Sequence, residues 1–415
     1  MYEKLADIFN AVAVKNLKAV DVPRGNSRSK GSNQHEIGGL VKVGFAEYLG
    51  RPENGEVLQY NATMIYITDE DAEPNICEDH VSWYDARHGQ SARGPEYRLY
   101  YKANEVTQFL REDDFFLIAL TKENTLFMIF SPRDSQAQQQ LKVLFSAVNV
   151  ATDATLKKVS IKDSDLMLPI RTLLAQLGIE LFSVRKDDND KLNIILDTFG
   201  SSFPKTKEFS IFARNHTSEL VCAINDPDGA LITWFDEEEH LFRLLERHIV
   251  ANRLRQGFGE RGDDVDAFIK FSLGVQNRRK SRAGHAFENH IAEVLTLNGV
   301  DFEAGVYTEG KQKPDFLFPS KSCYDDSSFD TSKLRMLGAK TSCKERWRQV
   351  LVEAIKIKNK HLITLEPAIS EEQTNQMNEL SLQLVVPQAI QKTYSKRQLQ
   401  SIISFEDFIS EVKGI

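Results

Sequence analysis

Two charged residues beside short apolar segments are the first candidates for chemistry. Asp315 follows Pro314 at the head of the apolar run 316–318. Proline cannot donate a backbone hydrogen bond within a sheet, so it belongs at the start of a strand. The Asp315 carboxylate is therefore expected at a sheet edge, where it is free to bind a cation. Lys340 ends a second predicted strand, 334–339, so an acid and a lysine on neighbouring strands would form one charged site.

This arrangement resembles the core of the PD-(D/E)xK nucleases. In that core two acids hold Mg²⁺, and the lysine orients or activates the attacking water. The second acid ordinarily lies two residues before the lysine, but this chain has Gly338 there. The replacement we expect is Glu353, thirteen residues after Lys340. A predicted helix over 345–357 would carry Glu353 on one of its faces and direct it back toward Asp315.

Longer stretches of the second half extend the resemblance. The stretches are VQNRRKSRAG (275–284), TEGKQKPDFLFPS (308–320), LRMLGAKTSCKERWRQVLVEA (334–354) and HLITLEPAISEEQ (361–373). They resemble the EcoRII-like type IIE restriction endonucleases, a group of the PD-(D/E)xK superfamily that reads CCGG or CC-x-GG cores. The resemblance is close over about residues 255–395.

The resemblance implies catalytic roles for individual residues. It places Asp315, Lys340 and Glu353 in the catalytic core, with Mg²⁺ as the cofactor. Glu288 matches an additional acid near the metal, so that Asp315, Glu353 and Glu288 would be the metal ligands. Tyr324 matches a tyrosine close to the same site.

The resemblance also implies which residues read the DNA bases. Lys344, Glu345 and Arg346 match the triplet that reads CC and GG half-sites. The chemistry fits, because cationic donors suit guanine O6 and N7, and an acid suits the cytosine amino group. The centre of the site stays open: CCGG, CC-W-GG, CC-N-GG and extended forms are all compatible with this triplet.

In the first half, HEIGG (35–39) and YDARHGQSARGPEYR (84–98) resemble the loops that bind effector DNA in this group. The positions at or near that effector site are His35, Arg87, Arg93, Glu96 and Arg98. The resemblance implies an N-terminal β-rich pseudo-barrel DNA-binding domain. It also implies a homodimer in which these domains block the catalytic cleft until a second copy of the DNA binds.

The pattern of apolar segments supports this division of the chain. Residues 1–150 carry strand-like runs at 58–68, 97–101, 115–120 and 125–130, followed by a helix over 131–148 that Ser131 would cap. We assign residues 1–160 to the effector-DNA-binding domain. Residues 161–205 are assigned to a linker region that includes a helix at 166–178 and a polar loop at 186–191.

Residues 206–415 are assigned to the endonuclease domain. Amphipathic helices are predicted there at 236–256, 264–275 and 281–298, and strands at 316–318, 334–339, 361–365 and 382–387. This alternation indicates an α/β catalytic domain with a mixed sheet of the restriction-endonuclease type.

Composition excludes several other classes. No run approaches the roughly 20 apolar residues of a membrane helix, and the N-terminus lacks a secretion-signal pattern. The four cysteines form no CxxC pair and the nine histidines show no metal-ligand spacing, so we expect no structural zinc and a cytoplasmic protein. The resemblance implies that this cytoplasm is prokaryotic. The net charge of −8 does not itself indicate DNA binding, but local basic runs lie at 277–282 and 340–348.

The sequence thus predicts a Mg²⁺-dependent type II restriction endonuclease that hydrolyses phosphodiesters in double-stranded DNA and leaves 5′-phosphates. A cognate cytosine methyltransferase would act on the same site. One alternative is a non-catalytic DNA-binding regulator that kept a nuclease fold. Another is a repair or mobile-element nuclease built on the same core.

Overall fold

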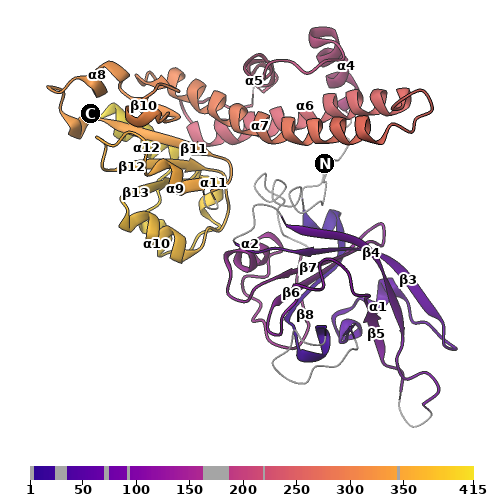
Figure 1. The fold of residues 1–415 in the computed structure, drawn as a ribbon. Coiled ribbons are helices and arrows are strands. Elements are labelled where there is room, and N and C mark those ends of the chain that lie inside the picture. The colour runs from indigo at the N-terminus through magenta and orange to yellow at the C-terminus, as the bar shows by residue number, and fades with distance from the viewer. Residues whose placement is uncertain are drawn as a thin grey trace. The chain divides into compact units, whose positions relative to one another are not determined.

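The structure is a computed structural model that describes residues 4–23, 35–69, 74–90, 94–161, 187–217, 220–343 and 346–415. The chain divides into two compact units, Met1–Ser183 and Val184–Ile415 (Figure 1). Each unit has its own sheet, and the two are described separately below. Among the described residues, no helix is long and apolar enough to cross a membrane.

Unit 1 is built on an eight-stranded sheet in the order β2-β5-β4-β3-β7-β6-β1-β8. Its strands are β1 (Phe9–Asn16), β2 (Glu36–Ile37), β3 (Val57–Tyr66), β4 (Asn75–Asp85), β5 (Tyr97–Tyr100), β6 (Phe115–Thr121), β7 (Leu126–Ser131) and β8 (Lys157–Lys158). Strands β3 and β7 run parallel, and the other pairings are antiparallel. Its short helices are η1 (Leu5–Asp7), η2 (Ala19–Asp21), η3 (Leu40–Val43), α1 (Ala46–Leu49) and α2 (Gln136–Leu144).

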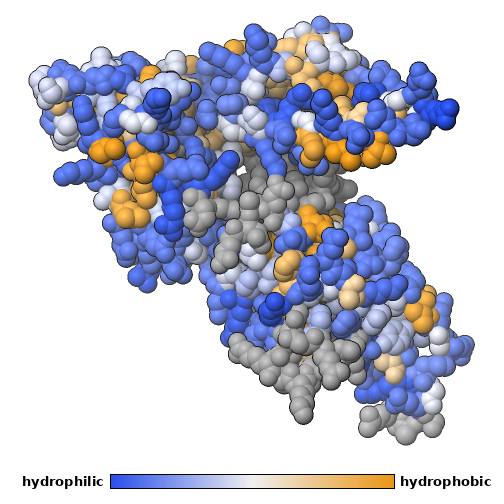
Figure 2. Space-filling model, in the orientation of Figure 1, coloured by the Kyte–Doolittle hydropathy of each residue, from blue (hydrophilic) through white to orange (hydrophobic). Residues whose placement is uncertain are grey.

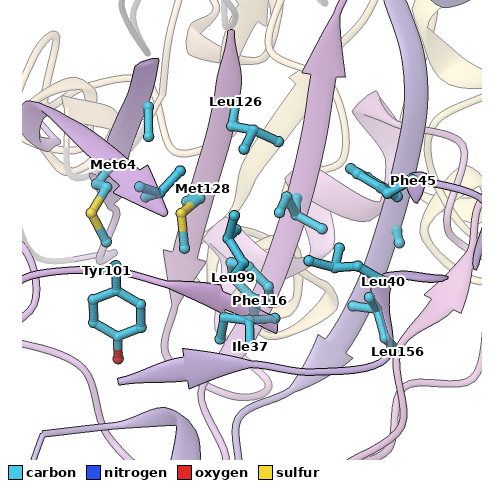
Figure 3. Close-up of a cluster of buried hydrophobic side chains, with 14 of the residues drawn as sticks. Ile37, Leu40, Phe45, Met64, Leu99, Tyr101, Phe116, Leu126, Met128 and Leu156 are labelled. Atoms are coloured by element: carbon cyan, nitrogen blue, oxygen red, sulfur yellow. The ribbon is translucent and has the colours of Figure 1, made fainter. Parts of the chain in front are cut away.

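Both faces of the central strands are buried. In β6, Phe116 and Ile118 join one apolar cluster, whereas Phe115 and Leu117 join another. Figure 3 shows the first cluster, in which Phe116 lies with Leu99 of β5 and Met128 of β7. Because successive strand residues point to opposite faces, an unbroken apolar run such as FFLIAL is typical of a strand covered on both sides.

The strands predicted in unit 1 are confirmed, but the start of the predicted helix is wrong. Ser131 is the last residue of β7, and the helix after it is α2. Ser135 caps that helix by accepting a hydrogen bond from the Gln138 amide at 3.1 Å. Ser131 is fully buried as part of the sheet, which explains why it is not the cap.

Unit 2 begins with four helices, α4 (Asp188–Phe199), α5 (Thr206–Asn215), α6 (Pro227–Gln256) and α7 (Val265–Leu297). Helix α7 is continuous where the sequence predicts two helices with a break near 276–280. That segment contains no proline or glycine, and its arginines bind the neighbouring helix. Arg279 donates to Glu246 of α6 at 2.7 Å, and Arg282 donates to Glu238 at 2.9 Å. The basic run 277–282 thus joins α7 to α6.

The polar segment 186–191 is not the loop that the sequence predicts, because α4 begins within it. Acidic residues in the first turn, Asp188 and Asp190, favour a helix N-terminus. Helix α4 is fixed to α6 by Lys191, which donates to Glu237 at 2.7 Å. The division between units falls inside 161–205, but residues from 188 onward belong to unit 2; the helix predicted at 166–178 lies outside the described residues.

The second half of unit 2 contains a five-stranded mixed sheet in the order β13-β12-β11-β10-β9. The strands are β9 (Glu303–Ala304), β10 (Phe316–Phe318), β11 (Arg335–Lys340), β12 (Lys360–Thr364) and β13 (Leu382–Val385). Strands β9 to β11 pair antiparallel, and β11 to β13 pair parallel. The predicted mixed sheet is confirmed.

Short helices connect and cover these strands. They are η4 (Glu309–Lys311), α8 (Lys321–Asp325), η5 (Thr331–Lys333), α9 (Trp347–Val350), α10 (Glu371–Glu379), α11 (Gln388–Gln391), η7 (Gln398–Gln400) and α12 (Phe405–Lys413). Asp228 in α6 ties two of them to the long helices. Its buried carboxylate accepts hydrogen bonds from the amides of Gln388, Phe405 and Glu406 at 2.9–3.1 Å.

Candidate active site

Strands β10 and β11 bring Asp315 and Lys340 together. Asp315 immediately precedes β10, and Lys340 is the last residue of β11. The Lys340 Nζ atom donates to Asp315 Oδ2 at 2.7 Å, and the Ala339 amide donates to the same oxygen at 2.7 Å. Both side chains are 17% exposed, so this charged pair lies at the surface of the sheet with limited access to water.

Gly338 has no room for the acid that usually occupies its position. It lies two residues before Lys340 on the same strand, so its side chain would point to the same face. A Cβ atom added at Gly338 would lie 2.8 Å from Val350 Cγ2 and 3.6 Å from Leu362 Cδ1. The missing side chain therefore allows α9 to pack directly on β11 through Val350.

Glu353 follows α9, but the predicted helix over 345–357 is wrong. The helical segment ends at Val350, and turns follow it. The amides of Ile355 and Lys356 bond to Glu309 and to the Tyr324 hydroxyl, which are far away in the sequence. The amides of 351–353 bond three residues back in turns, and those of Ile355 and Lys356 bond to side chains, so no continuous helix carries Glu353.

Glu353 nevertheless lies near the Asp315–Lys340 pair. Burial and the charge of Asp315 raise the pKa of Glu353 to about 7, although Lys340 and Lys360 oppose the shift. Its Oε2 atom is buried and has no hydrogen-bond partner. A carboxylate oxygen without a partner beside a second acid is an arrangement that a bound cation would stabilise.

Glu288 approaches the same pair from helix α7. Burial and the charge of Asp315 raise the pKa of Glu288, whereas His285 and Lys340 oppose the shift. The Glu288 side chain is 38% exposed. The site thus combines acids from three elements: the start of β10, the turn after α9, and α7.

The donor set fits a hard cation. Mg²⁺ is bound by one or two carboxylates together with water and phosphate oxygens. The buried Glu353 oxygen without a partner is the observation that supports this fit. No three acidic, histidine or cysteine side chains form a complete cage within the described ranges. Asp315, Glu353 and Glu288 are the carboxylates of this site that could provide ligands.

Tyr324, in α8, has no hydrogen bond to either member of the Asp315–Lys340 pair. Its hydroxyl donates to the two carboxylate oxygens of Glu309 at 2.6 and 2.7 Å. Sequence reasoning missed Glu309 because nothing in the local pattern distinguishes it from an exposed acid of a turn.

Of the predicted base-reading triplet, Lys344 and Glu345 lie outside the described residues. Arg346 is exposed directly before α9, and its amide donates to the Cys343 carbonyl at 2.7 Å. Cys343 is buried, and its own amide is bound by Glu366. The triplet therefore follows an anchored residue in the connection between Lys340 and α9.

Three of the predicted effector residues in unit 1 are joined by ion pairs, and a fourth, Arg93, lies outside the described residues. Arg87 and Arg98 both pair with Glu96. Arg98 also pairs with Glu36, which accepts a hydrogen bond from Tyr84. The sequence did not single out Glu36 or Tyr84.

His35 immediately precedes Glu36 but is not itself a member of these ion pairs. Its ring stacks on Tyr101 with ring centroids 5.3 Å apart.

Comparison with known families agrees with this geometry. Residues 242–409 match the family model described as EcoRII C terminal. These residues are similar to the C-terminal domain of EcoRII. They include β9 to β13 and every candidate catalytic residue named above, so the resemblance predicted from the sequence is confirmed for this part of the chain.

The chain is 40% identical over 214 residues to the type II restriction enzyme EcoRII of Escherichia coli. That match covers 51% of this chain and spans about half (51%) of the length of EcoRII.

Two solved structures of restriction enzymes with DNA also match this chain, at a lower identity than EcoRII does. Metal-depleted Ecl18kI with uncleaved DNA matches at 20% identity and a TM-score of 0.44, covering 55% of this chain and 84% of that one. The restriction endonuclease PspGI with substrate DNA matches at 17% identity and a TM-score of 0.41, covering 51% of this chain and 93% of that one. Both TM-scores are below 0.5, so the similarity to EcoRII rests on the two sequence matches.

Proposed function

We propose that this chain is a Mg²⁺-dependent type II restriction endonuclease that cleaves double-stranded DNA at sites with CC/GG half-sites. The observation that carries the proposal is the Asp315–Lys340 pair, with Glu353 beside it, inside a region similar to the EcoRII C-terminal domain. The proposed recognition residues, Lys344 to Arg346, lie in the connection that leaves this site.

The proposed reaction is hydrolysis of one phosphodiester bond in each strand. A water oxygen attacks phosphorus and loses a proton, the bond from phosphorus to the 3′ oxygen breaks, and that oxygen takes up a proton. The products are a 5′-phosphate and a 3′-hydroxyl. Lys340 holds and orients that water, and Asp315 fixes the lysine through the 2.7 Å hydrogen bond. Glu353 and Asp315 would hold the cation, which would supply charge stabilisation for the phosphate in the transition state.

Cleavage of plasmid DNA tests this function. Purified protein with Mg²⁺ should cut plasmids that carry several CC/GG sites faster than plasmids that carry one, and EDTA should abolish cutting. Sequencing the ends of the products identifies the central bases. Absence of cutting with Mg²⁺, or cutting without CC/GG at the ends, contradicts the proposal.

We further propose that unit 1 is a pseudo-barrel domain that binds an effector copy of the DNA and inhibits cleavage until it does so. Arg87 and Arg98 support this, because both are partly exposed and could exchange carboxylate partners for DNA phosphates or bases. The homodimer is supported by apolar side chains exposed on α7, namely Val265, Phe268, Ile269 and Leu273. Figure 2 shows an apolar patch along one edge of the α6–α7 pair.

A fragment that begins at Val184 should cut single-site DNA without effector DNA. The fragment keeps α4, which packs on α6, and it removes unit 1. If unit 1 inhibits cleavage, its removal shifts the whole population to the active form. The measurement compares initial rates on a single-site duplex for fragment and full chain, with and without a second duplex. A folded fragment that still requires the second duplex contradicts inhibition by unit 1.

A further inference from the structure

The turn that carries Glu353 is held by side chains from outside it. The Ile355 amide, two residues after Glu353, donates to the Glu309 carboxylate. The Lys356 amide donates to the Tyr324 hydroxyl at 3.2 Å. The Nζ atom of Lys360 donates to the backbone carbonyls of Ala354 at 3.1 Å and Ile357 at 2.7 Å. Ala354 has a left-handed backbone with φ of +45°, which only a well-fixed turn maintains in a residue other than glycine.

Glu309 and Tyr324 are also bound to each other. The buried Tyr324 hydroxyl donates to both Glu309 oxygens, and Lys356 Nζ donates to the Tyr324 carbonyl at 2.6 Å. Burial and the hydrogen bond to Glu309 raise the pKa of Tyr324, so the hydroxyl keeps its proton. Although burial opposes it, the bonds from Tyr324 and Ile355 lower the pKa of Glu309, which stays a carboxylate.

This network explains how the Glu353 carboxylate keeps its place although its Oε2 atom has no hydrogen-bond partner. The Glu353 Oε2 atom accepts no hydrogen bond, so the orientation of this side chain depends on the turn that carries it. The Tyr324 hydroxyl is engaged by Glu309 and the Lys356 amide, and its hydrogen bonds do not extend to the Asp315–Lys340 pair.

We propose that Glu309 and the Tyr324 hydroxyl form a clamp that positions Glu353 for metal binding, and that Tyr324 acts through this clamp without touching the reacting atoms. The proposal rests on the nuclease function above and adds Glu309 to its machinery as a positioning residue. Residues that orient a metal ligand typically change metal affinity or activity by about 10- to 100-fold when removed.

A double-mutant cycle tests the clamp. Glu309→Ala and Tyr324→Phe should each raise the Mg²⁺ concentration for half-maximal cleavage by about 10- to 100-fold. The double variant should show no larger shift than the stronger single variant, because both changes remove one unit. Glu309→Gln, which keeps an oxygen for the Ile355 amide, should recover part of the loss.

Hydrogen exchange provides a readout that does not depend on activity. The amides of 351–358 should exchange about tenfold faster or more in each variant, since Glu309→Ala removes the acceptor of the Ile355 amide and Tyr324→Phe removes that of the Lys356 amide. Tyr307→Phe and Glu379→Ala are matched controls at exposed positions, and both should behave as the parent chain does.

Several outcomes overturn the clamp. One is unchanged exchange over 351–358 in both single variants. Another is loss of cleavage in Tyr324→Phe at every Mg²⁺ concentration while Glu309→Ala keeps the parental rate, because Tyr324 would then act directly. If the shifts in Mg²⁺ concentration of the two single variants multiply in the double variant, Glu309 and Tyr324 do not act as one unit. Failure of the parent chain to cut DNA overturns only the nuclease function, since the exchange experiment still tests the clamp.

Discussion

Replacing Asp315 with asparagine should slow DNA cleavage by about 10³-fold or more and change DNA affinity by no more than about threefold. Asp315 is the acceptor for Lys340 Nζ and the proposed ligand of the cation. Asparagine keeps an oxygen for the Ala339 amide, so the strand ends should stay in place. It removes the charge that binds the cation, and charge stabilisation by a metal is worth several kcal/mol, of which each 1.36 kcal/mol is about tenfold in rate.

Single-turnover rates on a specific duplex measure this loss, and gel-shift titration without Mg²⁺ measures DNA affinity. Asp301→Asn, on the exposed surface after α7, is the matched control and should cut at the parental rate. An Asp315→Asn protein that cuts at the parental rate would remove Asp315 from the active site.

The central pair was predictable because it depends on local signals. Pro314 marks the start of β10, an apolar run defines β11, and both charged residues lie at the ends of these strands. The antiparallel register, with Phe316 opposite Leu337, then brings the two ends together. The absence of an acid at Gly338 could also be read directly from the sequence.

The element that carries Glu353 could not be predicted in the same way. Residues 345–357 have the composition of a helix, and local periodicity contains no sign that α9 ends at Val350. After Val350 the amides of 351–353 bond only three residues back. Two of the following amides are taken by Glu309, 46 residues before Ile355, and by Tyr324, 32 residues before Lys356. Tertiary partners at this separation override local helix propensity.

In unit 1, too, the strands could be predicted from local sequence, whereas the contacts between distant residues could not. Its strands were predictable from runs such as 115–120, which have apolar residues on both faces. The partner of Arg98 at Glu36 is separated by 62 residues, and the bond from Tyr84 to Glu36 spans 48. The pairing of β3 with β7 in parallel is likewise a long-range feature without a local signal.

Restoring an acid at the usual position of the motif should damage the protein. Gly338→Asp is expected to lower the free energy of unfolding by about 2–4 kcal/mol, through overpacking and the burial of a charge. The new Cβ would lie 2.8 Å from Val350 Cγ2, and Gly338 is buried in β11. Relief of this clash displaces α9, and therefore the turn with Glu353, so cleavage should fall as well. Urea unfolding and single-turnover rates measure the two effects.

A compensating change separates this steric cause from a general intolerance of substitution. Val350→Ala removes both methyl groups that the new Cβ would meet, at 2.8 and 3.2 Å. In Gly338→Asp/Val350→Ala, the loss of stability should therefore be smaller than the sum of the two single losses. Gly274→Asp, where an added Cβ meets no atom within 4 Å, should change stability by less than about 1 kcal/mol. If Gly338→Asp is as stable as the parent chain, Val350 does not close the position. The move of the second acid to Glu353 would then need another cause than the packing of α9 on β11.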